Sequence, residues 1–212
     1  MAKPEQIRVV LIRSGRTPWD DAGRIGGSSD LPLSPKGRTA VETAAGTLCG
    51  TQVSVVACSP DEASLESARI VAKAVAGAGG QEPKVRPIAE LANVCLGLWE
   101  GRTSSELEEK CPKAYRLWRE APTAVVVPEG ETLEEAQVRI TKALTRTLER
   151  AEGNACVAVV LRPLALALVR CWLDARDLDG VWSMVNDQEP TQWRTIPREL
   201  LRKRAERTRA SA

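Results

Sequence analysis

The stretch VLIRSGRTPWD, residues 10–20, joins an apolar run to a charged turn that contains glycine. The apolar run begins at Ile7, and its β-branched residues predict a buried strand over residues 7–12. Runs of the same kind predict strands at residues 53–58 and 155–161. Turns that follow such strands are common phosphate sites. The centre of this turn is Ser14, so the first question is which chemistry a serine can support there.

Helix start signals lie between and after the predicted strands. Ser34-Pro35 predicts a helix to about residue 49, and a capping box at Ser59–Glu62 predicts one to about residue 76. Capping boxes at 103–106 and 132–135 predict two more helix starts, and the second of these helices runs to about residue 150. A further apolar helix is predicted over residues 164–173. This alternation predicts an α/β protein, a three-layer α/β/α sandwich with a mostly parallel central sheet. We expect one domain over residues 1–212, with an irregular or partly helical insertion at about 85–128 and a basic tail at about 198–212.

The composition excludes several classes of protein. Of the 212 residues, 43% are hydrophobic and 27% charged, and the net charge is +2, which is ordinary for a globular protein. The apolar runs are too short to cross a bilayer, so we expect a cytoplasmic protein without a membrane partner. The six cysteines are scattered without a Cys-x-x-Cys pair, so we expect reduced thiols and no metal or other cofactor.

The basic tail is the one segment that raises the question of nucleic acid. It carries six basic residues, which include Arg204, Arg207 and Arg209, and only two glutamates. A solvated helical end or frayed tail is the favoured interpretation, with RNA or an acidic partner as the alternative. Because no aromatic residues alternate with the charges, we do not expect the tail to bind nucleic acid.

Five short segments occur in an order that is typical of one family. They are LIRSGRTPWD (11–20), GRIGGSSDLPLSPKGRTA (23–40), CSPDEASLESARIVA (58–72), LANVCLGLWEGRT (91–103) and PEGET (128–132). Together they resemble the histidine phosphatase superfamily, the phosphoglycerate mutase-like proteins, from about residue 9 to about residue 186. The resemblance implies an α/β fold and a phosphoryl transfer to a histidine.

The departures from the family pattern fall on its chemistry. The resemblance places the family's nucleophilic histidine at Ser14, its second arginine at Ala63, its acidic proton donor at Asn93 and its second histidine at Arg162. The chain contains no histidine at all. A serine hydroxyl needs an adjacent base to act as a nucleophile, and histidine is the usual one. No catalytic residue is therefore expected, and the resemblance implies a pseudo-phosphatase retained for binding, assembly or regulation.

Arg13, Arg16 and Arg162 are the candidates for binding an anion such as a phosphorylated small molecule, because guanidinium groups stay charged and donate in pairs. The alternative for Arg162 is an ion pair with Asp20 or Glu62 that fills the cavity. The expected protein partner is a second copy of the chain or an active relative.

An active phosphomonoesterase or mutase with altered machinery is the rival function. It would use Ser14, Cys58, or a metal ion held by Asp20, Asp61 and Glu62. Ser14 is more simply an inert pocket residue, and Cys58 is more simply a buried structural thiol than one whose pKa is lowered by the adjacent helix start. Trp99 is expected to pack the insertion onto the rest of the protein.

Overall fold

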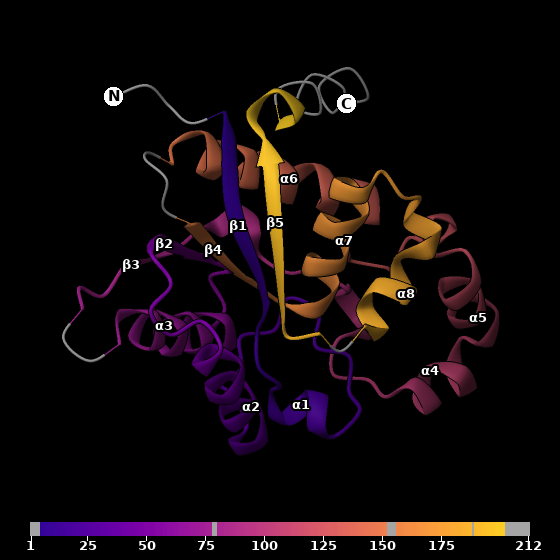
Figure 1. The fold of residues 1–212 in the computed structure, drawn as a ribbon. Coiled ribbons are helices and arrows are strands. Elements are labelled where there is room, and N and C mark those ends of the chain that lie inside the picture. Colours follow the sequence, from indigo (N-terminus) through magenta and orange to yellow (C-terminus); the bar gives the residue numbers. More distant parts are fainter. Residues whose placement is uncertain (1–4, 78–79, 152–155, 188, 202–212) are drawn as a thin grey trace.

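Five strands form the central sheet in the computed structural model, which describes residues 5–77, 80–151, 156–187 and 189–201 (Figure 1). The strands are β1 (Gln6–Arg13), β2 (Val53–Cys58), β3 (Lys84–Pro87), β4 (Cys156–Leu161) and β5 (Thr191–Pro197). Their order is β3-β2-β4-β1-β5, and every neighbouring pair is parallel except β1 and β5. The predicted α/β class with a mostly parallel sheet is confirmed.

The side chains of the central strands alternate between two apolar clusters. In β1, Val9 and Leu11 join one cluster while Val10 and Ile12 join the other. Successive strand residues point to opposite faces, so a strand covered on both faces is apolar at every position. All six residues of β4 are buried, which explains the continuous apolar run in its sequence.

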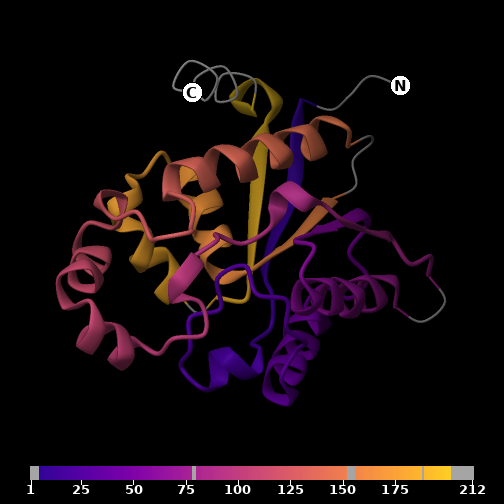
Figure 2. The ribbon, with the colours of Figure 1, turned by 180° about the vertical axis from the view of Figure 1, so that it is seen from behind.

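Helices cover both faces of the sheet, as the two opposite views show (Figures 1 and 2). On one face, α2 (Pro35–Gly46) and α3 (Glu62–Ala76) contribute to the smaller cluster. On the other, α6 (Leu133–Glu149) and α7 (Pro163–Asp174) contribute to the larger one. The short helices are α1 (Pro18–Asp21), α4 (Ser104–Lys110), α5 (Pro112–Glu120) and α8 (Val181–Asn186), with 3-10 turns at Ala89–Leu91, Gly97–Trp99, Pro122–Ala124 and Leu178–Gly180. The result is the predicted three-layer arrangement.

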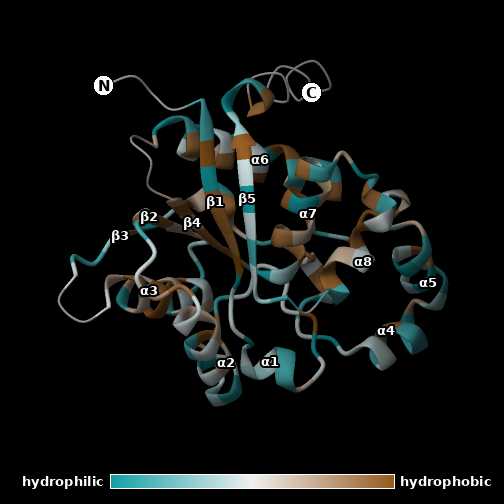
Figure 3. Cartoon of the chain, in the orientation of Figure 1, coloured by the Kyte–Doolittle hydropathy of each residue, from teal (hydrophilic) through white to brown (hydrophobic). Residues whose placement is uncertain are grey.

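Both edge strands differ from the sequence-based prediction. β5 was not expected, and β3 occupies the first residues of the segment predicted as an insertion at 85–128. Only Gln192 and Ile196 of β5 are buried, and no residue of β3 is. Figure 3 shows β2 and β4 in the brown of hydrophobic residues and β5 mostly in pale or teal tones. An edge strand lacks the continuous apolar run that reveals a central one. The rest of the predicted insertion is partly helical, as expected, with α4, α5 and three 3-10 turns joined by irregular segments.

The helix starts largely agree with their capping signals. Ser34, Thr103 and Thr132 are N-caps as predicted. The predicted box at Ser59 is wrong, because Asp61 is the N-cap of α3 and accepts from the backbone nitrogen of Ser64 at 3.0 Å. Ser59 instead donates its hydroxyl to Asp61. Helix α2 ends at Gly46, before the predicted residue 49.

The first residues of the predicted tail belong to the packed structure. Arg198 donates to the carbonyls of Glu149 (3.2 Å) and Ala151 (2.6 Å), and Leu201 is fully buried in the larger cluster. Residues 202–212 lie outside the described residues. Within the described ranges, no helix has the length and apolar character that a membrane crossing requires. All described elements belong to one sheet and its layers, while the single domain over residues 1–212 stays a prediction.

Candidate functional site

The loops after β1 and β4 meet at the carboxyl edge of the sheet, where ligands bind in open α/β folds. Arg13 is the last residue of β1, and Arg162 follows β4 directly. These two arginines and Asp20 of α1 line one cavity of about 250 Å³. Arg16 does not line this cavity: its exposed guanidinium donates to Asp21 Oδ1 at 2.6 Å. The structure thus brings together two of the three predicted anion-binding arginines.

Arg162 forms a buried ion pair inside the cavity. Its Nη2 donates to both carboxylate oxygens of Asp20 at 3.1 and 2.9 Å, and its Nη1 donates to the carbonyl of Gly15 at 3.0 Å. The Arg162 side chain is 6% exposed and that of Asp20 is 22% exposed. Of the two roles considered for Arg162, the pairing with Asp20 is therefore present in the structure.

Asp20 is held as a carboxylate. Burial, the largest influence, raises its pKa, but the charge of Arg162 and hydrogen bonds from Thr17 and Arg162 together outweigh it, so the pKa lies below its usual value. Thr17 donates from its backbone nitrogen (2.7 Å) and hydroxyl (2.9 Å) to Asp20 Oδ2. The bond from the Thr17 backbone nitrogen and a return bond from the Asp20 nitrogen to the Thr17 hydroxyl (3.3 Å) form the capping box of α1. Asp20 is a permanent negative charge in the cavity at neutral pH.

Arg13 supplies the second positive charge. Its Nη1 donates to the carbonyls of Val185 (3.0 Å) and Asp187 (3.3 Å), which lie at and just after the end of α8. Burial, the main cause, and the neighbouring Arg162 lower the pKa of Arg13, while Asp20 raises it. A guanidinium nevertheless stays protonated in proteins. Within the described ranges, no partner is found for its Nε and Nη2, which are the donors left for a ligand.

Ser14 and Ala63 occupy two positions where the resemblance places catalytic residues. Ser14 is 4% exposed, and its hydroxyl has no hydrogen-bond partner among the described residues. Its backbone nitrogen donates to the carbonyl of Leu161 at 2.8 Å, which fixes the turn to β4. Ala63 is fully buried in α3. A hydroxyl without a base beside it is a poor nucleophile.

The side chain of Asn93 joins its own loop to two other segments. Its Nδ2 donates to the carbonyl of Gly27 at 2.7 Å, and its Oδ1 accepts from the backbone nitrogen of Ala165 at 3.0 Å. The residue is 8% exposed. Both ends of the amide are used, so Asn93 ties the loop after α1 to the first turn of α7.

Replacing Asn93 by Asp is expected to lower the free energy of unfolding by about 1–3 kcal/mol at pH 7. The carboxylate would face the carbonyl of Gly27 without a proton to donate. Burial and this repulsion raise the pKa of the new carboxyl, so the loss is largest above that pKa and shrinks as the pH falls through it. Urea unfolding at pH 7 and pH 4.5 measures both values. Equal stability of the two proteins at pH 7 would contradict the assignment.

The cysteine and metal candidates of the rival function are not supported by the geometry. Burial, helped by the charge of Asp61, raises the pKa of Cys58 to about 12, so its thiol is protonated at neutral pH. Asp20 pairs with Arg162, Asp61 caps α3, and Glu62 is exposed. In the described part of the chain, no three His, Cys, Asp or Glu residues lie together in a way that could hold a metal ion.

Three aromatic side chains form a wall of the same cavity, which the sequence did not reveal. Tyr115 and Trp118 come from α5, and Trp182 comes from α8. The rings of Trp118 and Trp182 meet edge to face with centroids 5.3 Å apart. The Trp182 Nε1 donates to the carbonyl of Trp118 at 2.7 Å, and the Tyr115 hydroxyl donates to Ser104 at 2.8 Å. Because the Tyr115 hydroxyl and the Trp182 indole nitrogen are paired elsewhere, these rings present mainly apolar surface to the cavity. Trp99 is buried against Tyr115 and Trp118 of the same segment, and all three belong to the larger apolar cluster, which also contains residues of β1 and β4.

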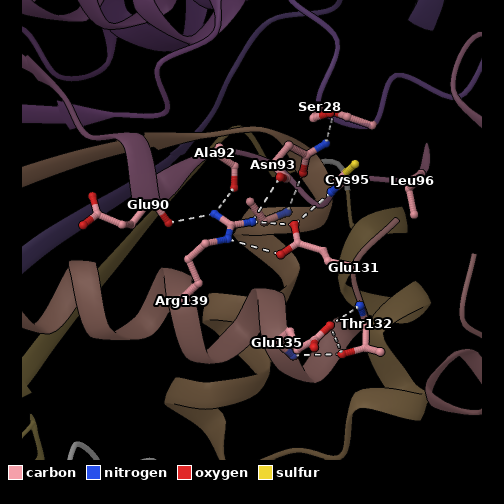
Figure 4. Close-up of polar contacts among 12 residues, drawn as sticks. Ser28, Glu90, Ala92, Asn93, Cys95, Leu96, Glu131, Thr132, Glu135 and Arg139 are labelled. Atoms are coloured by element: carbon pink, nitrogen blue, oxygen red, sulfur yellow. Dashed lines mark hydrogen bonds and ion pairs between the residues drawn. The ribbon is translucent and has the colours of Figure 1, made fainter. Parts of the chain in front are cut away.

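Arg139 of α6 holds the loop that carries Asn93 (Figure 4). Its Nη1 donates to the carbonyls of Glu90 (2.9 Å) and Ala92 (3.0 Å), and its Nη2 donates to the carbonyl of Asn93 (3.2 Å). The remaining N–H groups bind Glu131, through Nε at 3.2 Å and Nη2 at 2.6 Å. All five donors of the guanidinium are therefore used. Nothing in the sequence pattern pointed to this residue.

Comparison with known proteins identifies the family. The family model of the histidine phosphatase superfamily (branch 1) matches residues 9–206. The chain belongs to the histidine phosphatase superfamily. Phosphoserine phosphatase 1 of Hydrogenobacter thermophilus is 28% identical over 84% of this chain and 81% of its own length. The probable 2-carboxy-D-arabinitol-1-phosphatase of Arabidopsis thaliana is 31% identical over a matched region that spans 57% of this chain and 24% of the length of that relative. The structure of YhfR from Bacillus stearothermophilus superposes with a TM-score of 0.76 at 28% identity, covering 84% of each chain.

Membership of the histidine phosphatase superfamily confirms the resemblance on which the site residues were placed. Arg13 stands where the resemblance places the first arginine of the family pocket, and Arg162 stands where it places the second histidine. The two features that sequence reasoning missed, the aromatic wall and Arg139, lie outside those family segments. The aromatic wall requires α5 to meet α8, and the contacts of Arg139 require α6 to meet the loop at residues 90–93.

Proposed function

We propose that this chain is a histidine phosphatase-like protein without phosphatase activity, retained for binding, and that its cavity at the carboxyl edge of the sheet takes an anion. The observation that carries the proposal is the bonding of Arg162. The group at the position of the second histidine is a guanidinium whose Nη atoms donate to Asp20 and Gly15. It has no proton to exchange at neutral pH and therefore serves neither as an acid nor as a base.

The unused hydroxyl of Ser14 supports the same conclusion. A serine nucleophile needs a base within hydrogen-bond reach, and Ser14 Oγ has no hydrogen-bond partner in the described residues. Losing a general acid or base costs on the order of 100- to 10,000-fold in rate. Asn93, at the position of the acidic proton donor, cannot supply a proton to a leaving group. The combined losses are not additive, but together they leave the family's reaction without a route.

The decisive test is turnover of phosphate esters by the purified full chain. Because relatives are named as phosphatases, the substrates are p-nitrophenyl phosphate, 3-phosphoglycerate and phosphoserine, each with and without Mg²⁺ and Mn²⁺. We expect no phosphate release above that of an Arg13→Ala preparation, which controls for contaminating enzymes. Release that disappears in Arg13→Ala or Ser14→Ala would overturn the proposal, and so would a covalent phospho-adduct detected by mass spectrometry.

The assembly partner is proposed to be a second copy of this chain or an active relative. Retention of the fold without its chemistry supports a role in binding or assembly. Light scattering coupled to gel filtration tests the first case, with a dimer mass as the expected result. A monomer mass at micromolar concentration would exclude self-assembly, and assembly with an active relative would remain as the proposal.

A further inference from the structure

The cavity beside Arg162 combines a charged floor with an aromatic wall. Arg13, Asp20 and Arg162 form the floor, and Tyr115, Trp118 and Trp182 form much of the wall. We propose that this cavity binds a small aromatic carboxylate that carries a single negative charge. The inference rests on the proposed function, in that it assumes an anion that is bound and not turned over.

The charge of the floor favours a monoanion over a phosphate dianion. The floor holds two guanidinium groups and one carboxylate, so one positive charge is in excess. The Nη atoms of Arg162 already bind Asp20 and Gly15, so we assign the ligand to the Nε and Nη2 donors of Arg13. Paired guanidinium donors match the two oxygens of a carboxylate. A phosphate dianion would bring a second negative charge close to the carboxylate of Asp20.

The rim of the cavity does not change this preference. Arg24 lies 3.8 Å from Glu106 and donates to the carbonyl of Gly101, and Arg119 lies 5.3 Å from the ring centre of Trp182. Both are exposed, so solvent screens their charges, and the buried charges of the floor dominate the choice between anions. The neighbouring cavity of about 220 Å³ is lined by the carboxylates Asp30 and Asp61, so its negative charge disfavours an anion.

The wall and the size of the cavity define the body of the ligand. Its volume of about 250 Å³ lies just below the range of roughly 300–1,000 Å³ of small-molecule sites. Leu96, Leu164 and other apolar side chains add to the apolar surface around the three rings. Aromatic rings pack against one another in edge-to-face or offset geometry. A single-ring ligand therefore fits better than a sugar or an extended metabolite.

Isothermal titration of the full chain with three matched ligands tests the inference. The ligands are phenylacetate, phenyl phosphate and phenylacetamide, at pH 8 and low salt, where phenyl phosphate carries two charges because its second pKa is about 6. We expect phenylacetate to bind at least tenfold more tightly than phenyl phosphate, and phenylacetamide to show no binding. Equal or tighter binding of phenyl phosphate overturns the inference, and so does the absence of phenylacetate binding.

Asp20→Asn and Asp21→Asn form a matched pair of variants on α1. Asp20→Asn leaves two excess positive charges in the floor, so the preference is expected to move at least tenfold toward phenyl phosphate. Asp21 pairs with Arg16 outside the cavity, so Asp21→Asn is expected to keep the wild-type ratio. Trp182→Leu, at a partly exposed ring, is expected to weaken phenylacetate at least fivefold without changing the charge preference. An unchanged ratio in Asp20→Asn overturns the charge argument.

Phosphate release measured during the phenyl phosphate titration separates the two proposals. Hydrolysis that Arg13→Ala abolishes overturns the proposed function. Tight binding of phenyl phosphate without hydrolysis overturns only the choice of a carboxylate. Failure of phenylacetate and phenyl phosphate alike to bind overturns the inference, while the lack of turnover still stands.

Discussion

Replacing Arg162 by Met is expected to lower the free energy of unfolding by about 3–5 kcal/mol at pH 7. The variant leaves the buried carboxylate of Asp20 without its cation and the carbonyl of Gly15 without its donor. Removing one partner of a buried pair is costly because the other charge stays desolvated. Urea or guanidinium unfolding gives the value directly.

The dependence on pH and a second variant separate this cause from a simple loss of packing. The pKa of Asp20 is lowered in the folded protein, so the pair's contribution is fully present above the unfolded pKa of about 3.9 and is lost as the pH falls through the folded pKa. The gap between wild type and Arg162→Met should therefore narrow below about pH 4. The double variant Asp20→Asn/Arg162→Met should be more stable than Arg162→Met alone.

Arg16→Met is the matched control on the same turn. Arg16 and Asp21 are paired at 2.6 Å, but the Arg16 side chain is 54% exposed, and exposed pairs contribute about 0–1 kcal/mol. A loss in Arg162→Met no larger than in Arg16→Met would mean that Arg162 is free for ligands, and the structural role assigned here would be wrong.

The sequence predicts the central strands well because their physical environment is simple. β1, β2 and β4 lie between two helical layers, so their residues form short apolar runs. β3 and β5 lie at the edges of the sheet, where Lys84, Arg86 and Trp193 are exposed to solvent. Their sequences therefore lack the continuous apolar run of a central strand. Capping signals locate helix starts because they are local, and the error at Ser59 arose because Asp61, two residues later, competes for the same role.

The site was only partly predictable for a different reason. The family resemblance placed Arg13, Asn93 and Arg162 at strand ends and loops, and the structure brings all three to one cavity. Whether Arg162 would bind Asp20 or a ligand depended on a contact across 142 residues of sequence, which no local pattern encodes. The aromatic wall likewise requires α5 and α8 to meet, and that packing is a property of the folded chain.

Replacing Arg139 by Met is the second substitution expected to have a large effect, a loss of about 3 kcal/mol in the free energy of unfolding. The guanidinium satisfies the carbonyls of Glu90, Ala92 and Asn93 and neutralises Glu131. Arg139 and Glu131 are 27% and 21% exposed, so water replaces these contacts only in part. Arg139→Lys should recover some of the loss, because an ammonium keeps the charge but lacks the planar fork of donors.

Arg146 on the same helix provides the control, because it is an exposed arginine whose loss is expected to have little effect on stability. Its pairing with Glu90 spans 3.7 Å between side chains that are 61% and 51% exposed, so Arg146→Met should change stability by no more than about 0.5 kcal/mol. Because Arg139 fixes the backbone of Asn93, Arg139→Met should also weaken phenylacetate binding while Arg146→Met leaves it unchanged. Equal effects of the two variants on stability would mean that Arg139 contributes no more than an exposed charged residue. The proposal that it positions the loop at residues 90–95 beside the cavity would then be wrong.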